Sequence, residues 1–153
     1  WKNLSYYDFI GFVAVTAILL FVLYFGGLWY ATYDYRIQMR DQMVEMYKQL
    51  PNPIPPIEDD YGVHQRWLVF YIDGVKVLNK PQPENVINEY KKALEKEGWA
   101  TEREYEHVRN DKNKIYGINM RKGEFILSVS ARENRDSINI HLIKRDWIYN
   151  KGF

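Results

Sequence analysis

The sequence predicts a single-pass transmembrane helix plus a small α+β domain, an antiparallel sheet of about four or five strands with one helix packed on it. Three observations predict this class: an uncharged apolar run near the start of the 153-residue chain, one amphipathic helix after a proline-rich segment, and several alternating β-forming runs. Residues 1–50 are expected to form a transmembrane helix that continues into an amphipathic helix. A linker over residues 51–60 then leads to a soluble domain over residues 61–153.

Composition argues against several classes of protein. The 21 basic and 20 acidic residues nearly balance, which argues against a nucleic-acid-binding protein that needs a basic surface. The sequence contains no cysteine, so it offers no disulfide, thiolate metal site or cysteine nucleophile. The chain begins at Trp1 rather than at methionine, and we expect it to be processed or truncated.

The apolar run covers residues 9–32 and carries no charged side chain. It exceeds the ~20 residues that a helix needs to cross the hydrocarbon core of a bilayer. A buried helix in a small soluble domain would be shorter and would have a polar face, which this run lacks. Aromatic side chains, which favour the lipid headgroup zone, flank it on both sides: Trp1, Tyr6 and Tyr7, then Trp29, Tyr30, Tyr33 and Tyr35. The pattern predicts one membrane span.

Two arguments about the orientation of the span disagree: the charges beside it and the shortness of its N-terminal flank. Arg36, Arg40 and Lys48 follow it and only Lys2 precedes it, so the positive-inside rule would place the C-terminal domain in the cytoplasm. The rule requires the whole N-terminal flank, however, and an anchored domain behind a short flank is more often exported. We therefore expect an extracytoplasmic domain.

Small and acidic residues mark candidate contacts between the span and other membrane helices. Gly27 and Ala31 form a small-xxx-small pair that permits close helix approach, and Gly11 is a further small position. Asp8 lies at the mouth of the span and has two interpretations. Its carboxylate either reaches interfacial water or pairs with the charge of a partner within the membrane.

A methionine-rich stripe follows the span at helical spacing: Met39, Met43, Met46, Tyr47 and Leu50. No glycine or proline interrupts the chain after Gly27 until residue 51, so we expect one continuous helix over about residues 4–50 that the prolines then end. The stripe either packs on the protein's own domain or contacts a partner helix through Met39, Met43, Met46 and Leu50.

The start of the domain follows from turn signals. Residues 51–60 contain four prolines and are typical of a stiff extended linker. The run over residues 66–72 is rich in β-forming side chains and predicts a strand. Asp73 and Gly74 then predict a tight hairpin turn into a short second strand.

The clearest helix of the domain covers residues 83–98. Pro83 suits its first turn and Gly98 its C-terminal cap. One apolar stripe would pack it on a sheet: Val86, Ile87, Tyr90, Ala93 and Leu94. Alternating runs predict further antiparallel strands over residues 101–108, 115–120, 125–131 and 137–143.

The sequence shows no catalytic or cofactor-binding motif. It lacks glycine-rich nucleotide loops, a Gly-x-Ser-x-Gly elbow and a haem attachment site. Its three histidines lie in separate predicted elements, without a second ligand at metal-site spacing: His64, His107 and His141. The alternating acids Glu102, Glu104 and Glu106 are typical of a solvated sheet edge. We expect no enzyme, no catalytic residue, no metal site and no cofactor.

Two resemblances concern parts of the chain. Val86, Tyr90, Leu94 and a closing Gly98-Trp99, followed by alternating strands, resemble a pattern in small, mostly uncharacterised bacterial envelope domains. This resemblance covers roughly a third of the chain and implies an extracytoplasmic α+β module without naming an activity.

The order of elements is similar to that of type IV pilin-like proteins, in which a half-apolar, half-amphipathic helix precedes an antiparallel sheet. Mature pilins begin apolar at once and carry a glutamate at the fifth position. This chain has Ser5 there, and Asp8 is the nearest acid. The resemblance implies a structural subunit of a filament.

These observations predict a non-catalytic accessory subunit of a larger membrane protein complex. Its partners would be the lipid bilayer and other membrane protein subunits, with no nucleic acid, and its domain would dock or stabilise them. A pilin-like filament subunit is the alternative. A tethered ligand-binding domain or enzyme is the third hypothesis.

Overall fold

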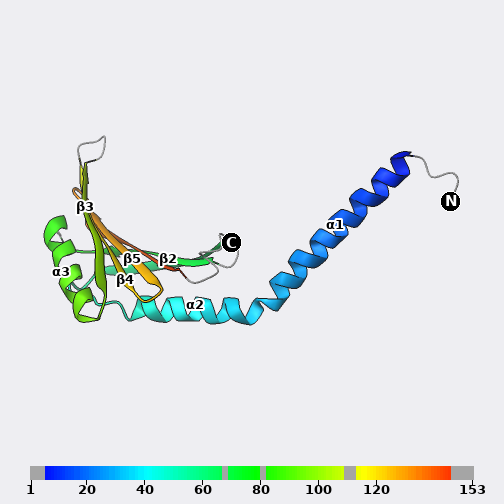
Figure 1. Ribbon diagram of the computed structural model, residues 1–153. Coiled ribbons are helices and arrows are strands. Elements are labelled where there is room, and N and C mark those ends of the chain that lie inside the picture. The colour runs from blue at the N-terminus through cyan, green and yellow to red at the C-terminus, as the bar shows by residue number, and fades with distance from the viewer. Residues whose placement is uncertain (1–5, 67–68, 80–81, 109–112, 146–153) are drawn as a thin grey trace. The chain divides into compact units, whose positions relative to one another are not determined.

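The computed structural model describes residues 6–66, 69–79, 82–108 and 113–145. These residues form three helices and six strands (Figure 1). The chain divides into two compact units, Trp1–Gln38 and Met39–Phe153. The predicted class, one long apolar N-terminal helix and an antiparallel sheet with helices packed on it, is confirmed, with slightly more strands than expected.

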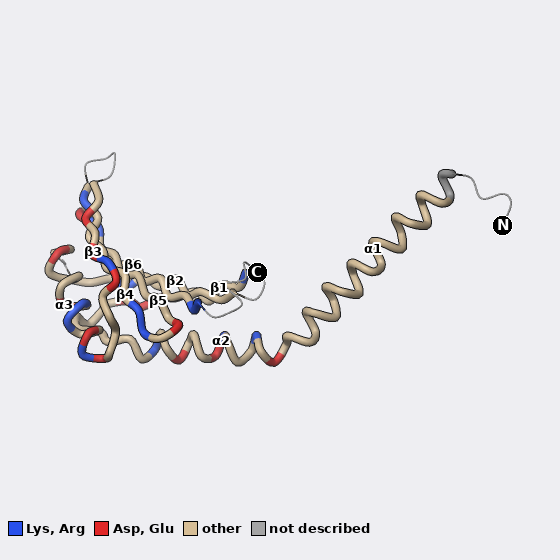
Figure 2. Tube along the Cα trace, viewed as in Figure 1, with Lys and Arg blue, Asp and Glu red and all other residues tan. Residues whose placement is uncertain are grey.

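The first unit consists of α1 (Tyr6–Ala31) and the first residues of α2 (Tyr33–Lys48). Within α1, the segment Phe9–Ala31 is long and apolar enough to cross a membrane, and none of its most apolar stretch is buried in the protein. Figure 2 shows no charged position along this segment.

Thr32 interrupts the helix that the sequence predicts as continuous. Its hydroxyl donates a hydrogen bond to the carbonyl oxygen of Leu28 at 2.8 Å, and this local bond competes with regular helix geometry. The amide of Arg36 still donates to the Thr32 carbonyl at 3.0 Å. The prediction of one unbroken helix over residues 4–50 is therefore wrong at this position.

The second unit is built on a six-stranded antiparallel sheet with the order β1-β2-β6-β5-β4-β3 (Figure 1). Its strands are β1 (Glu58–Arg66), β2 (Val69–Val77), β3 (Ala100–Val108), β4 (Lys114–Lys122), β5 (Phe125–Arg132) and β6 (Ser137–Lys144). Strands β3 to β6 form a meander, and β2 pairs with β6. The helix α3 (Pro83–Lys96) connects β2 to the opposite edge strand, β3.

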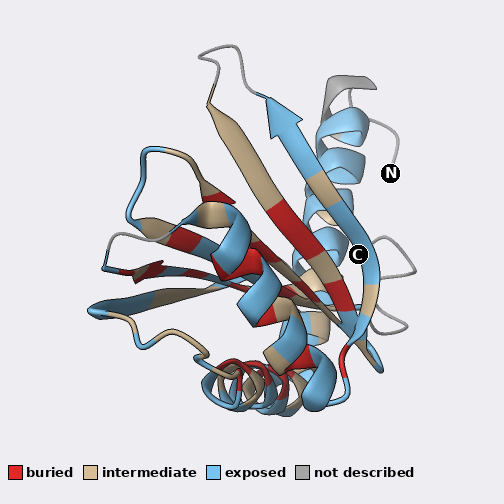
Figure 3. Ribbon diagram, turned by 90° about the vertical axis from the view of Figure 1, so that its left-hand side faces the viewer, coloured by how far each residue is buried: buried red, intermediate tan, exposed pale blue. Residues whose placement is uncertain are grey.

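One face of the sheet carries the core. The helix α3 packs on β3, β4 and β5 through its buried residues Val86, Ile87, Tyr90 and Leu94. Figure 3 shows buried positions on α3 and on the strands behind it. The alternation of β6 is confirmed, because Ile138, Ile140 and Leu142 are buried and the residues between them are not. The last turns of α2 contribute Met43 and Tyr47 to the buried set.

The C-terminal end of α3 is capped as the sequence predicts. Gly98 adopts a φ of +84°, a left-handed conformation that glycine adopts at little cost. The amide of Trp99 donates to the Leu94 carbonyl at 3.0 Å, and the amide of Gly98 donates to the Glu95 carbonyl at 3.1 Å. This pair of bonds satisfies carbonyl groups that a helix end leaves open.

Two predictions about the start of the domain are wrong. The linker is shorter than residues 51–60, because β1 begins at Glu58. None of the nine residues of β1 is buried, so this edge strand lacks the apolar alternation that identifies a strand in sequence. Asp73 and Gly74 form no turn but lie in the middle of β2. The ring of Tyr47 covers Gly74 so closely that a Cβ atom there would collide with it.

A buried ammonium group joins α2, the proline segment and the sheet. Lys76 of β2 points into the core and is 1% exposed. Its Nζ lies 3.1 Å from a carboxylate oxygen of Asp59 and donates a hydrogen bond to the Asn52 side chain. The hydroxyl of Tyr47 donates to the other oxygen of Asp59 at 3.1 Å. Burial, with the nearby Asp59 carboxylate, raises the pKa of Tyr47, so its hydroxyl stays protonated.

Replacing Asp59 by asparagine should destabilise the domain. The change keeps the shape of the side chain but leaves the Lys76 ammonium buried without its anion. Because a third of the Asp59 side chain is exposed, we expect the free energy of unfolding to fall by about 1–3 kcal/mol, less than for a fully buried pair. Urea denaturation of the full chain in detergent measures this.

Asp60→Asn is the matched control, because Asp60 is exposed on the other side of the same strand. It should change the free energy of unfolding by less than about 0.5 kcal/mol. Equal losses for the two variants would contradict the assignment of Asp59 as the counter-charge.

Candidate functional site

The small residues of α1 have free space beside them, which a neighbouring helix could fill. No atom outside the local helix lies within 4 Å of the position that a Cβ would take at Gly11 or Gly27. Ala31 is likewise exposed. The three candidate helix contacts therefore lie on free surface within the first unit. The side chain of Asp8, the candidate for a polar contact in the membrane, is outside the described residues.

The methionine stripe belongs mainly to the core of the second unit. Met39, Met43 and Leu50 are buried, so they are not a surface for a partner helix, and the interpretation that the stripe packs on its own domain holds for them. Met46 is half-buried and lines a shallow hollow beside Phe125 of β5. Of the four candidate contacts, only Met46 keeps a surface that a partner could reach.

The sheet face opposite α3 carries a group of four side chains from three neighbouring strands. We call His64, Tyr71, Asp73 and His141 the histidine cluster. Strand β2 lies between β1 and β6, and it supplies Tyr71 opposite His64 and Asp73 opposite His141. All four alternate with core positions such as Ile72, so they point away from the core.

The Asp73 carboxylate lies between the two imidazole rings. One of its oxygens is 2.6 Å from Nδ1 of His141, and the other is 3.8 Å from Nε2 of His64. The Tyr71 ring is stacked beside His64 at 5.1 Å between centroids and lies 5.5 Å from the ring of His141. If the ring is neutral with its proton on Nδ1, this contact is a hydrogen bond to the carboxylate and Nε2 is the free acceptor.

Gly62 makes room for this arrangement. It lies opposite Asp73 in the ladder, and a Cβ at this position would be 2.9 Å from Nε2 of His64. The absence of a side chain lets the His64 ring fold back along β1 toward Asp73. Sequence reasoning missed the cluster, because it predicted no strand at β1 and could not pair β2 with β6. The outward position of His141 on its strand was the one available signal.

The cluster is open rather than enclosed. The side chains of His64, Asp73 and His141 are each about half exposed. Within the described parts of the chain, no three His, Cys, Asp or Glu side chains are placed to hold a metal ion. The cluster combines two proton-binding rings, a carboxylate and an aromatic side chain on a flat surface. Such a combination suits recognition of a polar partner surface.

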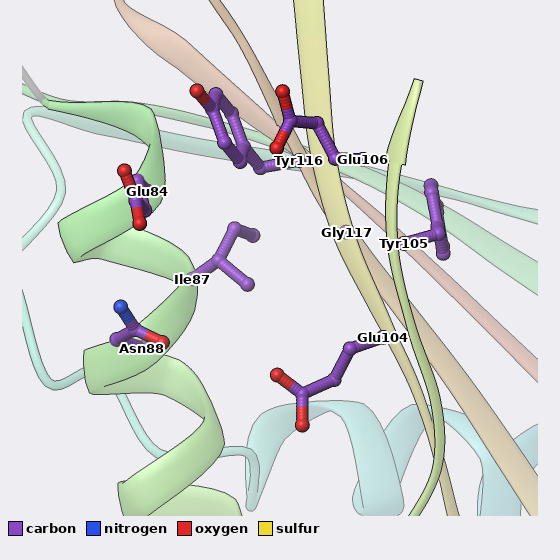
Figure 4. A pocket seen from close by; sticks show the side chains of 8 residues that line it. All are labelled: Glu84, Ile87, Asn88, Glu104, Tyr105, Glu106, Tyr116 and Gly117. Atoms are coloured by element: carbon purple, nitrogen blue, oxygen red, sulfur yellow. The ribbon is translucent and has the colours of Figure 1, made fainter.

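A cleft of about 250 Å³ lies between α3 and the strands β3 and β4. Figure 4 shows Glu104 and Glu106 directed toward α3, and Tyr105 directed away from it over Gly117. Both acids are paired: Glu104 with Lys91 at 2.5 Å and Glu106 with Lys114 at 2.8 Å. The side chains of the four paired residues remain partly exposed, so the cleft is a solvated sheet edge.

The predicted alternation of the three acids on β3 is wrong at Glu102. A register shift between Thr101 and Arg103 inserts an extra residue into β3. Glu102 consequently pairs with Arg121 of β4 at 3.2 Å and does not line the cleft with Glu104.

Replacing Asp73 by asparagine should change the protonation site of His141. The carboxylate accepts a hydrogen bond from Nδ1 and favours the proton there, whereas an amide removes the negative charge. We expect the neutral His141 ring to shift toward the Nε2–H form, which is the form that nitrogen chemical shifts in NMR distinguish. His107, on the far edge strand β3, should keep its spectrum. An unchanged His141 signal would contradict the assigned bond.

Two surfaces of the described residues are thus open to partners. One is the apolar helix α1, and the other is the face of the sheet that carries the histidine cluster, opposite the face on which α3 packs. A comparison of the chain with models of known protein families and with curated proteins finds no match. These two surfaces are therefore the basis on which a function is proposed.

Proposed function

We propose that this protein is a non-catalytic accessory subunit of a larger membrane protein complex. The helix α1 anchors it as a single span, and the domain lies outside the cytoplasm, where it docks or stabilises partner subunits. One observation carries the proposal: the 23 residues Phe9–Ala31 form an uncharged apolar helix, and none of its most apolar stretch is buried.

The exposure of this helix in water would be very unfavourable. Large side chains such as Phe12 and Leu23 are about two-thirds exposed. Full burial of one such side chain is worth about 1.5–3 kcal/mol, and the helix carries more than a dozen. Contact with lipid tails or with neighbouring helices removes this cost without any change in the helix.

Close helix packing accounts for the small residues of the span. Helices in lipid associate through van der Waals contact and favour small residues that let their backbones approach. Gly27 and Ala31 provide such a surface near one end of α1, and Gly11 provides one near the other. These positions fit contact with transmembrane helices of partner subunits.

The pairing and exposure of the polar side chains in the domain favour docking to a partner protein over catalysis. Two of the three acids that line its cleft, Glu104 and Glu106, are neutralised by ion pairs, and the histidine cluster is half exposed rather than shielded from water. A catalytic site usually excludes water and places a perturbed acid, base or nucleophile against substrate. The open sheet face with the histidine cluster is the surface that we assign to contact with a partner.

Anchoring is tested by placing a charge at the centre of the span. Leu19→Arg should reduce membrane insertion, since an arginine at the bilayer centre costs about 2.5–3.5 kcal/mol. Tyr33→Arg is the control, because an arginine at the headgroup level costs little. The measurement is the fraction of full-length protein that stays in membranes after alkaline extraction. Wild-type protein in the aqueous supernatant would refute the proposal.

Assembly is tested at Gly27. Gly27→Leu should lower the amount of partner subunits that copurify in mild detergent, because the larger side chain separates the helices. Phe21→Trp enlarges an exposed side chain on a face of α1 that carries none of the three small contact positions, and it should leave copurification unchanged. Native gels and mass spectrometry measure both variants. Sheared surface filaments composed only of this chain would favour the pilin-like alternative instead.

A further inference from the structure

We infer that the junction between α1 and α2 binds the headgroup of one phospholipid that carries a phosphate and a primary ammonium group, as phosphatidylethanolamine does. The inference rests on the proposed membrane anchoring, because the site would lie at the headgroup level. It assigns a specific ligand to residues that anchoring alone leaves without a role.

The junction contains a hollow of about 780 Å³. It is formed by the last residues of the apolar segment Phe9–Ala31 and the first residues of α2, at the depth where a bilayer changes from hydrocarbon to headgroups. Six of the residues that line it are Gly26, Trp29, Tyr30, Tyr33, Asp34 and Arg36. Gly26 contributes no side chain, and a Cβ at this position would meet open space. The hollow therefore combines apolar walls with two opposite charges.

Arg36 supplies the group that recognises phosphate. Its guanidinium lies 3.5 Å above the Trp29 ring, and its Nη2 donates a hydrogen bond to the Trp29 carbonyl at 2.9 Å. The residue is only 9% exposed, and its Nε–H has no hydrogen-bond acceptor within the described chain. A buried guanidinium donor without an acceptor is costly, and a phosphate satisfies two such donors at once. The stacked ring fixes the guanidinium in place for that contact.

Asp34 supplies the group that recognises the amine. Its exposed carboxylate lines the same hollow and makes no ion pair within the residues that the structure describes. The rings of Tyr30 and Tyr33, 84% and 56% exposed, stand beside it and favour a cation through their faces. A primary ammonium donates hydrogen bonds to a carboxylate, whereas the quaternary ammonium of phosphatidylcholine has no N–H donor.

The two charges together select among headgroups. An anionic headgroup such as phosphatidylglycerol would place no cation beside Asp34, so its net negative charge would be repelled there. Phosphatidylcholine would satisfy Arg36 and place its quaternary ammonium on the tyrosine rings, but it has no N–H group to donate to Asp34. Phosphatidylethanolamine satisfies both charges of the hollow.

Lipid retention tests the inference. The full chain is reconstituted in an equal mixture of phosphatidylethanolamine, phosphatidylglycerol and phosphatidylcholine, extracted in mild detergent, and analysed for retained lipid by native mass spectrometry. We expect the ethanolamine lipid to be enriched roughly tenfold, the size of one charge-assisted hydrogen bond. Arg36→Gln should abolish this enrichment, and Asp34→Asn should remove the preference over phosphatidylcholine while phospholipid is still retained.

Arg40→Gln is the matched control, because Arg40 is exposed and pairs with Asp41 at 3.1 Å. It should retain the wild-type lipid. Equal retention of the three lipids, an unchanged Arg36→Gln variant, or displacement of the lipid by millimolar inorganic phosphate would each overturn the inference. Alkaline extraction of the same samples separates the two proposals: wild-type protein in the aqueous fraction refutes anchoring, whereas membrane-bound protein without lipid selectivity refutes the headgroup site alone.

Discussion

The arrangement of the domain depends on the buried ammonium group of Lys76. Lys76 and Asp59 are direct cross-strand partners, so their ion pair fixes the register of β1 on β2. The strand β1 has no buried side chain and cannot set this register through hydrophobic burial. A slip by one residue would turn Asp59 to the outer face and leave Lys76 without its anion. Buried ion pairs are best attested in such a register-setting role.

The same register of β1 on β2 also brings together the side chains on the opposite face of the sheet. With Asp59 against Lys76, Gly62 comes opposite Asp73 and His64 comes opposite Tyr71. The histidine cluster therefore depends on the same register of β1 on β2 as the ion pair on the core side, together with the pairing of β2 with β6. Tyr47 links the two further, because it bonds to Asp59 and covers Gly74. Glycines within these strands mark places where a ring folds over the backbone, which explains why they interrupt no strand.

The apolar helix and the domain impose different demands on the chain. The segment Phe9–Ala31 has no charged side chain and is long and apolar enough to cross a membrane, whereas the domain buries its own core beneath α2 and α3. Apart from the half-buried Met46, the methionine stripe is part of that core, so the proposed contacts with partner helices are assigned to α1. At the end of α1, Trp29 and Arg36 combine an aromatic platform with a charge, a pairing suited to the headgroup zone.

The sequence by itself determined the features that depend on neighbouring residues. Length and lack of charge identify the apolar helix, Gly98 identifies the end of α3, and alternation identifies β6. Only the tertiary structure decided the features whose cause lies far along the chain. Strand β1 pairs with β2 in the register that places Asp59 against Lys76, and Gly74 lies within β2 beneath the ring of Tyr47. The histidine cluster joins His64 and His141 because β2 lies between their strands, and no local pattern encodes that pairing.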